Sequence, residues 1–149
     1  MMASGQEILL GEEGSEQLRV RVLCRAYPGG LCLLDDNWLH AELIARAAGR
    51  RLRCPAFLRA PDLAKLSRSL ARLAQRSCDR ALLEPRCGTI RVAIRRAGDG
   101  FAAEVHARDD GSERSIAFGW DLDAARLDRL TREVAAVVEA FPPMARAPR

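Results

Sequence analysis

The side chains of this sequence that could do chemistry are first of all its carboxylates. Six of the aspartates stand in three close pairs: Asp35 with Asp36, Asp109 with Asp110, and Asp121 with Asp123. Paired carboxylates can act as general acid and base or hold a metal ion. The first two pairs, however, stand in turn-like stretches, where aspartate bonds to its own backbone, and the third precedes an expected helix. Local structure explains all three pairs, so we predict no catalytic residue among them.

Five cysteines and two histidines are the remaining candidate nucleophiles and metal ligands. No C-x-x-C pair occurs, and neither His40 nor His106 stands near a pair of cysteines, so the ligand spacing of a zinc site is missing. A catalytic Cys–His pair is arithmetically possible, but no local sequence favours one. We expect the cysteines to be small buried side chains in a reducing cytoplasm, and we predict no metal and no cofactor.

Phosphate-binding and nucleophile-elbow motifs are missing from the sequence as well. Gly98-Asp-Gly100 is too short for a phosphate loop and has the form of a hairpin turn. No apolar run reaches the roughly 18 residues of a membrane span, and the first residues show no secretory signal. The sequence therefore predicts a cytoplasmic protein that is not an enzyme and has no membrane partner.

The hydrophobic pattern describes a unit that occurs twice, four strands followed by one helix. Alternating apolar residues predict strands at 6–10, 17–25, 38–47 and 50–58, and then at 80–84, 89–96, 101–108 and 114–120. Leucines and valines at helical spacing predict one helix from Pro61 and another after Asp121 or Asp123, ending at Pro142. The two halves, about 6–77 and 80–142, make one domain of residues 1–149, with a flexible tail at 143–149.

These elements predict an α+β fold in which one continuous antiparallel sheet carries both helices on the same face. Pro55 lacks a backbone donor, so its strand should lie at an edge or carry a bulge. The face toward the helices would include Leu18, Val20, Val22 and Cys24. The opposite, exposed face would carry mainly charged side chains: Arg19, Arg21, Trp38, His40, Glu42, Arg51, Arg53, Arg91, Arg95, Glu104 and His106.

The net charge of +4 and the pI of about 9.1 suggest nucleic acid as one class of partner. The arginines of the exposed face could bind phosphate groups. Acidic residues are interspersed throughout, however, Lys65 is the one lysine among 24 basic residues, and few aromatic side chains are available to stack bases. A nucleic-acid-binding module is therefore the alternative to a protein-binding function.

Several short motifs are spread over nearly the whole domain: Asp36-Asn-Trp-Leu39, Pro61-Asp-Leu63, Leu83-Glu-Pro85, Asp121-Leu122 and Phe141-Pro142. Together they resemble a family of small bacterial immunity proteins (WapI-like) associated with wall-associated contact-dependent toxins. The resemblance implies a cytoplasmic non-enzyme that binds and neutralises a co-encoded toxin. It assigns no functional residue in this chain.

We expect a protein partner to bind where the two halves differ. The first half has the longer second loop, residues 27–37, so the stretch 27–38 is the first candidate. Ile8-Leu-Leu10 could form an exposed edge strand, which would allow a homodimer. The candidate partner-binding residues are Asp35, Asp36, Trp38, His40, Arg19, Arg21, Arg91 and Arg95.

Overall fold

The structure, a computed structural model, describes residues 6–12, 14–26, 37–85 and 88–144. Its first half contains β1 (Gln6–Gly11), β2 (Gln17–Arg25), β3 (Trp38–Ala47), β4 (Arg50–Arg59) and α2 (Ala60–Ala74). Its second half contains β5 (Arg80–Leu83), β6 (Ile90–Ala97), β7 (Gly100–Arg108), β8 (Ser115–Leu122) and α3 (Ala124–Ala140). The α+β class and the two β-β-β-β-α units are thus confirmed.

The strands form two four-stranded antiparallel sheets rather than the one continuous sheet that we expected. The strand orders are β1-β2-β3-β4 in the first sheet and β5-β6-β7-β8 in the second. Each half completes its own meander, and α2 then leads the chain away from the edge at β4 before β5 begins. Pro55 accordingly lies on an edge strand, as its missing backbone donor predicts.

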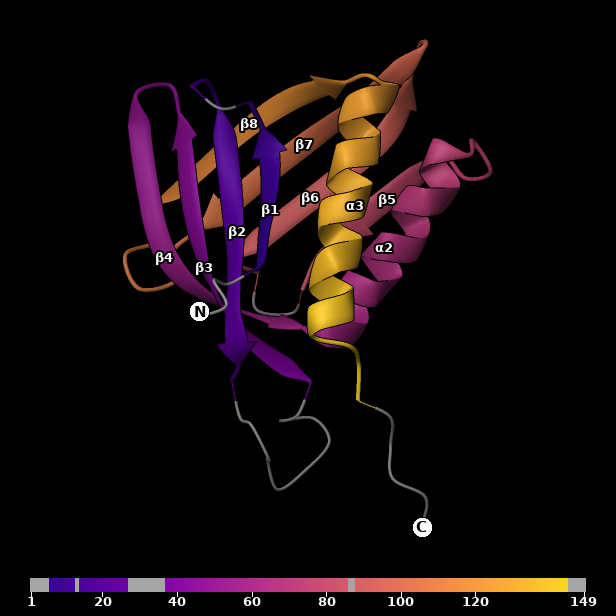
Figure 1. Ribbon diagram of the computed structural model, residues 1–149. Helices are drawn as coiled ribbons and strands as arrows, with labels where there is room; N and C mark the ends of the chain where they lie inside the picture. The colour runs from indigo at the N-terminus through magenta and orange to yellow at the C-terminus, as the bar shows by residue number, and fades with distance from the viewer. Residues whose placement is uncertain (1–5, 13, 27–36, 86–87, 145–149) are drawn as a thin grey trace.

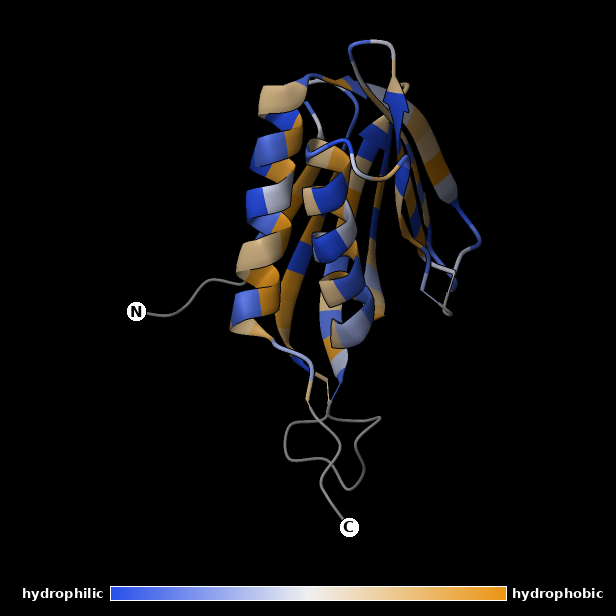
Figure 2. Ribbon diagram, turned by 90° about the vertical axis from the view of Figure 1, so that its right-hand side faces the viewer, coloured by the Kyte–Doolittle hydropathy of each residue, from blue (hydrophilic) through white to orange (hydrophobic). Residues whose placement is uncertain are grey.

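The hydrophobic core lies between the two sheets and is closed on one side by the helix pair (Figure 1). The first sheet and the second sheet each turn one apolar face inward, and the buried side chains of all the strands join those of α2 and α3 in one cluster. The two helices lie side by side, as the view onto them in Figure 2 shows. Each helix packs against the edge strand of the other half, α3 along β1 and α2 along β5.

Both helices bury the apolar stripe that their spacing predicts. Pro61 stands in the first turn of α2, whose N-cap residue Arg59 makes no side-chain capping bond. Asp123, rather than Asp121, caps α3, because its side chain accepts a hydrogen bond from the backbone N–H of Arg126 at 2.8 Å. The buried stripes are Leu63, Leu66, Leu70 and Leu73 in α2, and Leu127, Leu130, Val134 and Val137 in α3.

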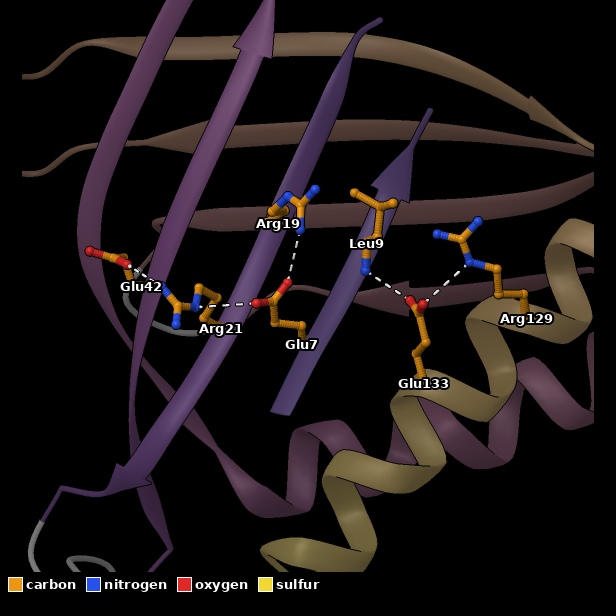
Figure 3. Close-up of polar contacts among 7 residues, drawn as sticks. All are labelled: Glu7, Leu9, Arg19, Arg21, Glu42, Arg129 and Glu133. Atoms are coloured by element: carbon orange, nitrogen blue, oxygen red, sulfur yellow. Dashed lines mark hydrogen bonds and ion pairs between the residues drawn. The ribbon is translucent and has the colours of Figure 1, made fainter. Parts of the chain in front are cut away.

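The edge of β1 is packed against α3, which does not support the possibility of an exposed, pairing strand at residues 8–10. The backbone N–H of Leu9 donates to Glu133 Oε1 of α3 at 2.8 Å (Figure 3). Arg129, one turn earlier in α3, holds the same carboxylate at 3.3 Å. A helix carboxylate thus occupies a donor that a second chain would need, and a homodimer through this edge is not supported.

The end of the described chain is attached to the start of β3. The side-chain oxygen of Asn37, a buried residue, accepts from the backbone N–H of Met144 at 2.8 Å. Arg25 donates to the carbonyl of Pro142 at 2.8 Å. Pro142 and Met144 are thus held near the start of β3. The rest of the predicted tail, residues 145–149, lies outside the described part.

Candidate functional site

A network of charges crosses the outer face of the first sheet. Glu7, Arg21 and Glu42 stand directly opposite one another on β1, β2 and β3. Arg21 Nε lies 3.3 Å from Glu7 Oε2, and Arg21 Nη1 lies 3.6 Å from Glu42 Oε1. Arg19 reaches Glu7 at 3.1 Å, and Arg53 of β4 reaches Glu42 at 2.8 Å (Figure 3 shows the contacts of Glu7 and the Arg21–Glu42 pair).

This network compensates the arginines that we predicted on the exposed face. The two carboxylates are each shared between two guanidinium groups, and the hydrogen bond from Arg53 to Glu42 raises the pKa of Arg53 further. Phosphate groups would have to displace these carboxylates in order to bind Arg19 or Arg21. The alternative of a nucleic-acid interface on this face therefore gains no support from the arrangement.

Next to the network, at the end of the face where β3 begins, lies an exposed aromatic cluster. His40 and Phe57 are cross-strand neighbours, and their rings stack with centroids 5.4 Å apart at an interplanar angle of 21°. Phe57 is 43% exposed, Leu23 of β2 is 40% exposed, and Trp38 is half-buried. We call Leu23, Trp38, His40 and Phe57 the aromatic end.

Alternation along β3 and β4 predicted the outward direction of Trp38 and His40 and also fits Phe57. It failed in β2, where the register shifts between Val22 and Cys24. After this bulge Cys24 pairs with His40 and is exposed, instead of sharing the buried face of Leu18, Val20 and Val22. No residue type in this stretch signals the bulge, so the sequence did not reveal it.

Arg91 and Arg95 lie on the outer face of the second sheet, whereas Arg19 and Arg21 lie on that of the first. The single arginine-rich face that we predicted is divided between two sheets with different outward directions, because the strands do not form one sheet. Arg91 Nε is bound by Glu84 at 2.8 Å. A hollow of about 530 Å³ lies on this face, lined by Arg91, Glu104, Val105, His106, Ala117, Phe118 and Gly119.

Asp35 and Asp36 lie outside the described residues, as does nearly all of the loop 27–37. The second aspartate pair has the structural role that its sequence predicts. Asp109 accepts from the Gly111 N–H at 3.1 Å and from Ser112 Oγ at 2.9 Å, and Asp110 pairs with Arg108 at 2.8 Å. Within the ranges that the structure describes, no group of three or more metal-ligating side chains is present.

Cys54 is the buried cysteine of the described part and is held as a thiol. Its Sγ lies 3.8 Å from the carbonyl oxygen of Arg108, the last residue of β7. Burial, together with the negative charges of Asp109 and Asp110, raises the pKa of Cys54 to about 11. Because the thiolate is the reactive form, this cysteine is a poor nucleophile at neutral pH.

The fold and its outer faces are those of a small α+β protein whose broadest accessible surfaces are two sheet faces. The chain belongs to the WapI-like immunity protein family, whose sequence model matches residues 8–142. The family resemblance of the short motifs is thereby confirmed. No helix in the described ranges has the length and apolar character needed to cross a membrane.

Among solved structures, two similar chains are MRP1/MRP2 from Trypanosoma brucei and WHY1 from Arabidopsis thaliana. The first has a TM-score of 0.49 at 11% identity, with 94% of this chain and 86% of that chain covered. The second has a TM-score of 0.47 at 12% identity, with 95% and 86% covered. No curated protein matches the chain significantly.

Proposed function

We propose that this protein neutralises a co-encoded toxin in the cytoplasm by binding it, without catalysing a reaction. The observation that carries the proposal is its membership of an immunity protein family, with a match that extends from β1 to the end of α3. An immunity protein of this kind needs a surface for one protein partner rather than a catalytic pocket.

The aromatic end is the surface that we propose for this contact. Residues that dominate the binding energy of protein interfaces are enriched in tryptophan, tyrosine and arginine and are surrounded by contacts that exclude water. Trp38 and Phe57 supply apolar area here. Arg53, the most exposed member of the charge network, lies on the same face of β4, four residues before Phe57, with its side chain 69% exposed. The predicted binding residues Trp38, His40, Arg19 and Arg21 all lie on this one face.

The experiment is co-expression of the toxin domain encoded beside this gene with the chain and its variants, followed by affinity measurement on the purified pair. The wild type should restore growth and bind the toxin tightly. Phe57→Ala should weaken binding at least tenfold, as expected for a central aromatic contact. Arg95→Ala, an exposed strand residue on the outer face of the other sheet, is the matched control and should bind as the wild type does.

Two outcomes would contradict the proposal. Absence of both protection and a stable complex would remove the immunity function. Equal weakening by Phe57→Ala and Arg95→Ala would leave the function but remove the aromatic end as its surface. Binding of the isolated chain to nucleic acid, with an affinity that falls steeply as salt rises and is lost in Arg21→Ala, would favour the alternative function.

A further inference from the structure

Glu104 is the carboxylate that lines the hollow on the outer face of the second sheet. It lies on β7, the inner strand next to the edge strand β8, and its cross-strand neighbours are Ala93 on β6 and Gly119 on β8. Neither neighbour has a side chain longer than a methyl group. The carboxylate is exposed and forms no ion pair or hydrogen bond with any described residue.

The corresponding carboxylate of the first sheet has a different environment. Glu42 occupies the same place on β3, opposite Arg21, and it is held by Arg21 and by Arg53. In the second sheet Ala93 stands where Arg21 would be, and Ala117 stands where Arg53 would be. Ala117 lines the hollow, whereas Ala93 lies opposite Glu104 on β6 and is not part of the lining. Small residues thus stand at both positions from which arginines bind the carboxylate in the other half of the molecule.

The other charges around the hollow leave Glu104 as its uncompensated group. Arg91, at one end, is bound by Glu84 at 2.8 Å, so its charge is already balanced. Arg95 is exposed on the same face of β6 and does not line the hollow. The site therefore offers a carboxylate above a floor of small side chains, with His106 beside it.

We propose that this hollow binds an arginine side chain presented by a protein partner. A guanidinium group matches a carboxylate by two parallel hydrogen bonds, and its methylene stem can pack on the small side chains at Ala117 and Gly119. The volume of about 530 Å³ leaves room for the whole side chain. This contact is separate from toxin binding at the aromatic end, because the hollow lies on the outer face of the other sheet.

The first test is a titration of the ¹⁵N-labelled protein with N-acetylarginine amide, followed by backbone amide shifts. N-acetylcitrulline amide has the same shape without the charge and serves as the control ligand. The arginine compound should shift amides of Ala93, Glu104 and Gly119 with saturation, whereas the citrulline compound should not. Glu104→Gln should weaken the binding roughly three- to fivefold, the effect of one exposed ion pair.

The second test changes the surroundings of Glu104 by substitutions in the chain itself. Ala93→Arg rebuilds the arrangement of Arg21 and Glu42 and should abolish the arginine-dependent shifts. Gly119→Val fills the hollow without adding charge; a Cβ at Gly119 meets its nearest atom, the Ala103 carbonyl oxygen, at 3.9 Å, so the fold should accept it. Matched shifts with the two ligands, or shifts that persist in folded Ala93→Arg and Glu104→Gln variants, would overturn the proposal. If Phe57→Ala lost toxin binding but still bound the arginine compound, the result would support an arginine site that is separate from the toxin contact.

Discussion

The two halves of this protein share a core plan and differ on their surfaces. In the first sheet a carboxylate at the centre of the outer face is held between arginines of the neighbouring strands. In the second sheet the same place holds Glu104, and small residues stand around it. Buried positions alternate in the same way in both halves. The buried faces of the two halves are thus alike, whereas their outer faces differ in which charged side chains contact one another.

Core positions should therefore respond alike in the two halves, and they give the largest expected effect. Leu70 of α2 and Val134 of α3 are equivalent stripe residues, and both are fully buried. Leu70→Ala should lower the free energy of unfolding by about 2–5 kcal/mol, and Val134→Ala by somewhat less, because fewer methyl groups are removed. Urea denaturation with both variants measures this. If Val134→Ala left the free energy of unfolding nearly unchanged, the second half would be packed more loosely than the first.

Substitutions at the N-caps of the two helices should affect stability differently. Asp123→Ala removes the side-chain acceptor for the Arg126 N–H and should cost about 1 kcal/mol. Arg59, the N-cap residue of α2, has no such bond, so Arg59→Ala should cost clearly less at the helix start. Thermal unfolding of the two variants compares them. Equal losses would mean that Arg59 stabilises the fold through another contact.

The two central carboxylates should differ in a smaller but measurable way. Glu42→Ala leaves Arg21 and Arg53 without their shared partner and should cost roughly 0.5–1 kcal/mol. Glu104→Ala removes no ion pair and should change stability by less than about 0.5 kcal/mol. High salt should reduce the difference. A costly Glu104→Ala would indicate that this carboxylate supports the fold rather than an external ligand.

The smallest effect is expected for Ala93→Arg. The new guanidinium can pair with Glu104 but stands next to Arg95 on the same strand face, so repulsion offsets part of the attraction. The free energy of unfolding should change by less than about 0.5 kcal/mol. Denaturation of the variant used in the binding test measures this directly. A severe loss would show that this sheet face cannot hold a long side chain at position 93.

The sequence predicted nearly every strand and helix to within one or two residues. This succeeded because alternation and the leucine stripe depend on which side of an element is buried, which is a local property. The number of sheets was not predictable in this way, since periodicity does not say which strand edges pair. Periodicity did not predict the bulge before Cys24 or the hydrogen bond from the Leu9 N–H to Glu133 either. Both depend on contacts between residues that are distant in the chain.

For the candidate surfaces, the sequence identified residues but not their grouping. Trp38, His40, Arg19 and Arg21 do share a face, whereas Arg91 and Arg95 lie on another. The isolation of Glu104 could not be predicted either. It follows from the cross-strand register that places Ala93 and Gly119 opposite it, and register was not fixed by the pattern alone.

Each helix packs against the edge strand of the other half, and this arrangement has a consequence for the synthesis of the protein. The edge of β1 is covered by Glu133, and the edge of β5 is covered by α2. On the ribosome, the first sheet is complete in sequence long before α3 has been translated, and its first strand then presents open backbone donors. The nascent first half is thus the stage most exposed to wrong pairing. Once α3 has left the ribosome, it can cover the edge of β1. A chain truncated within α3 should therefore aggregate rather than form a smaller stable domain.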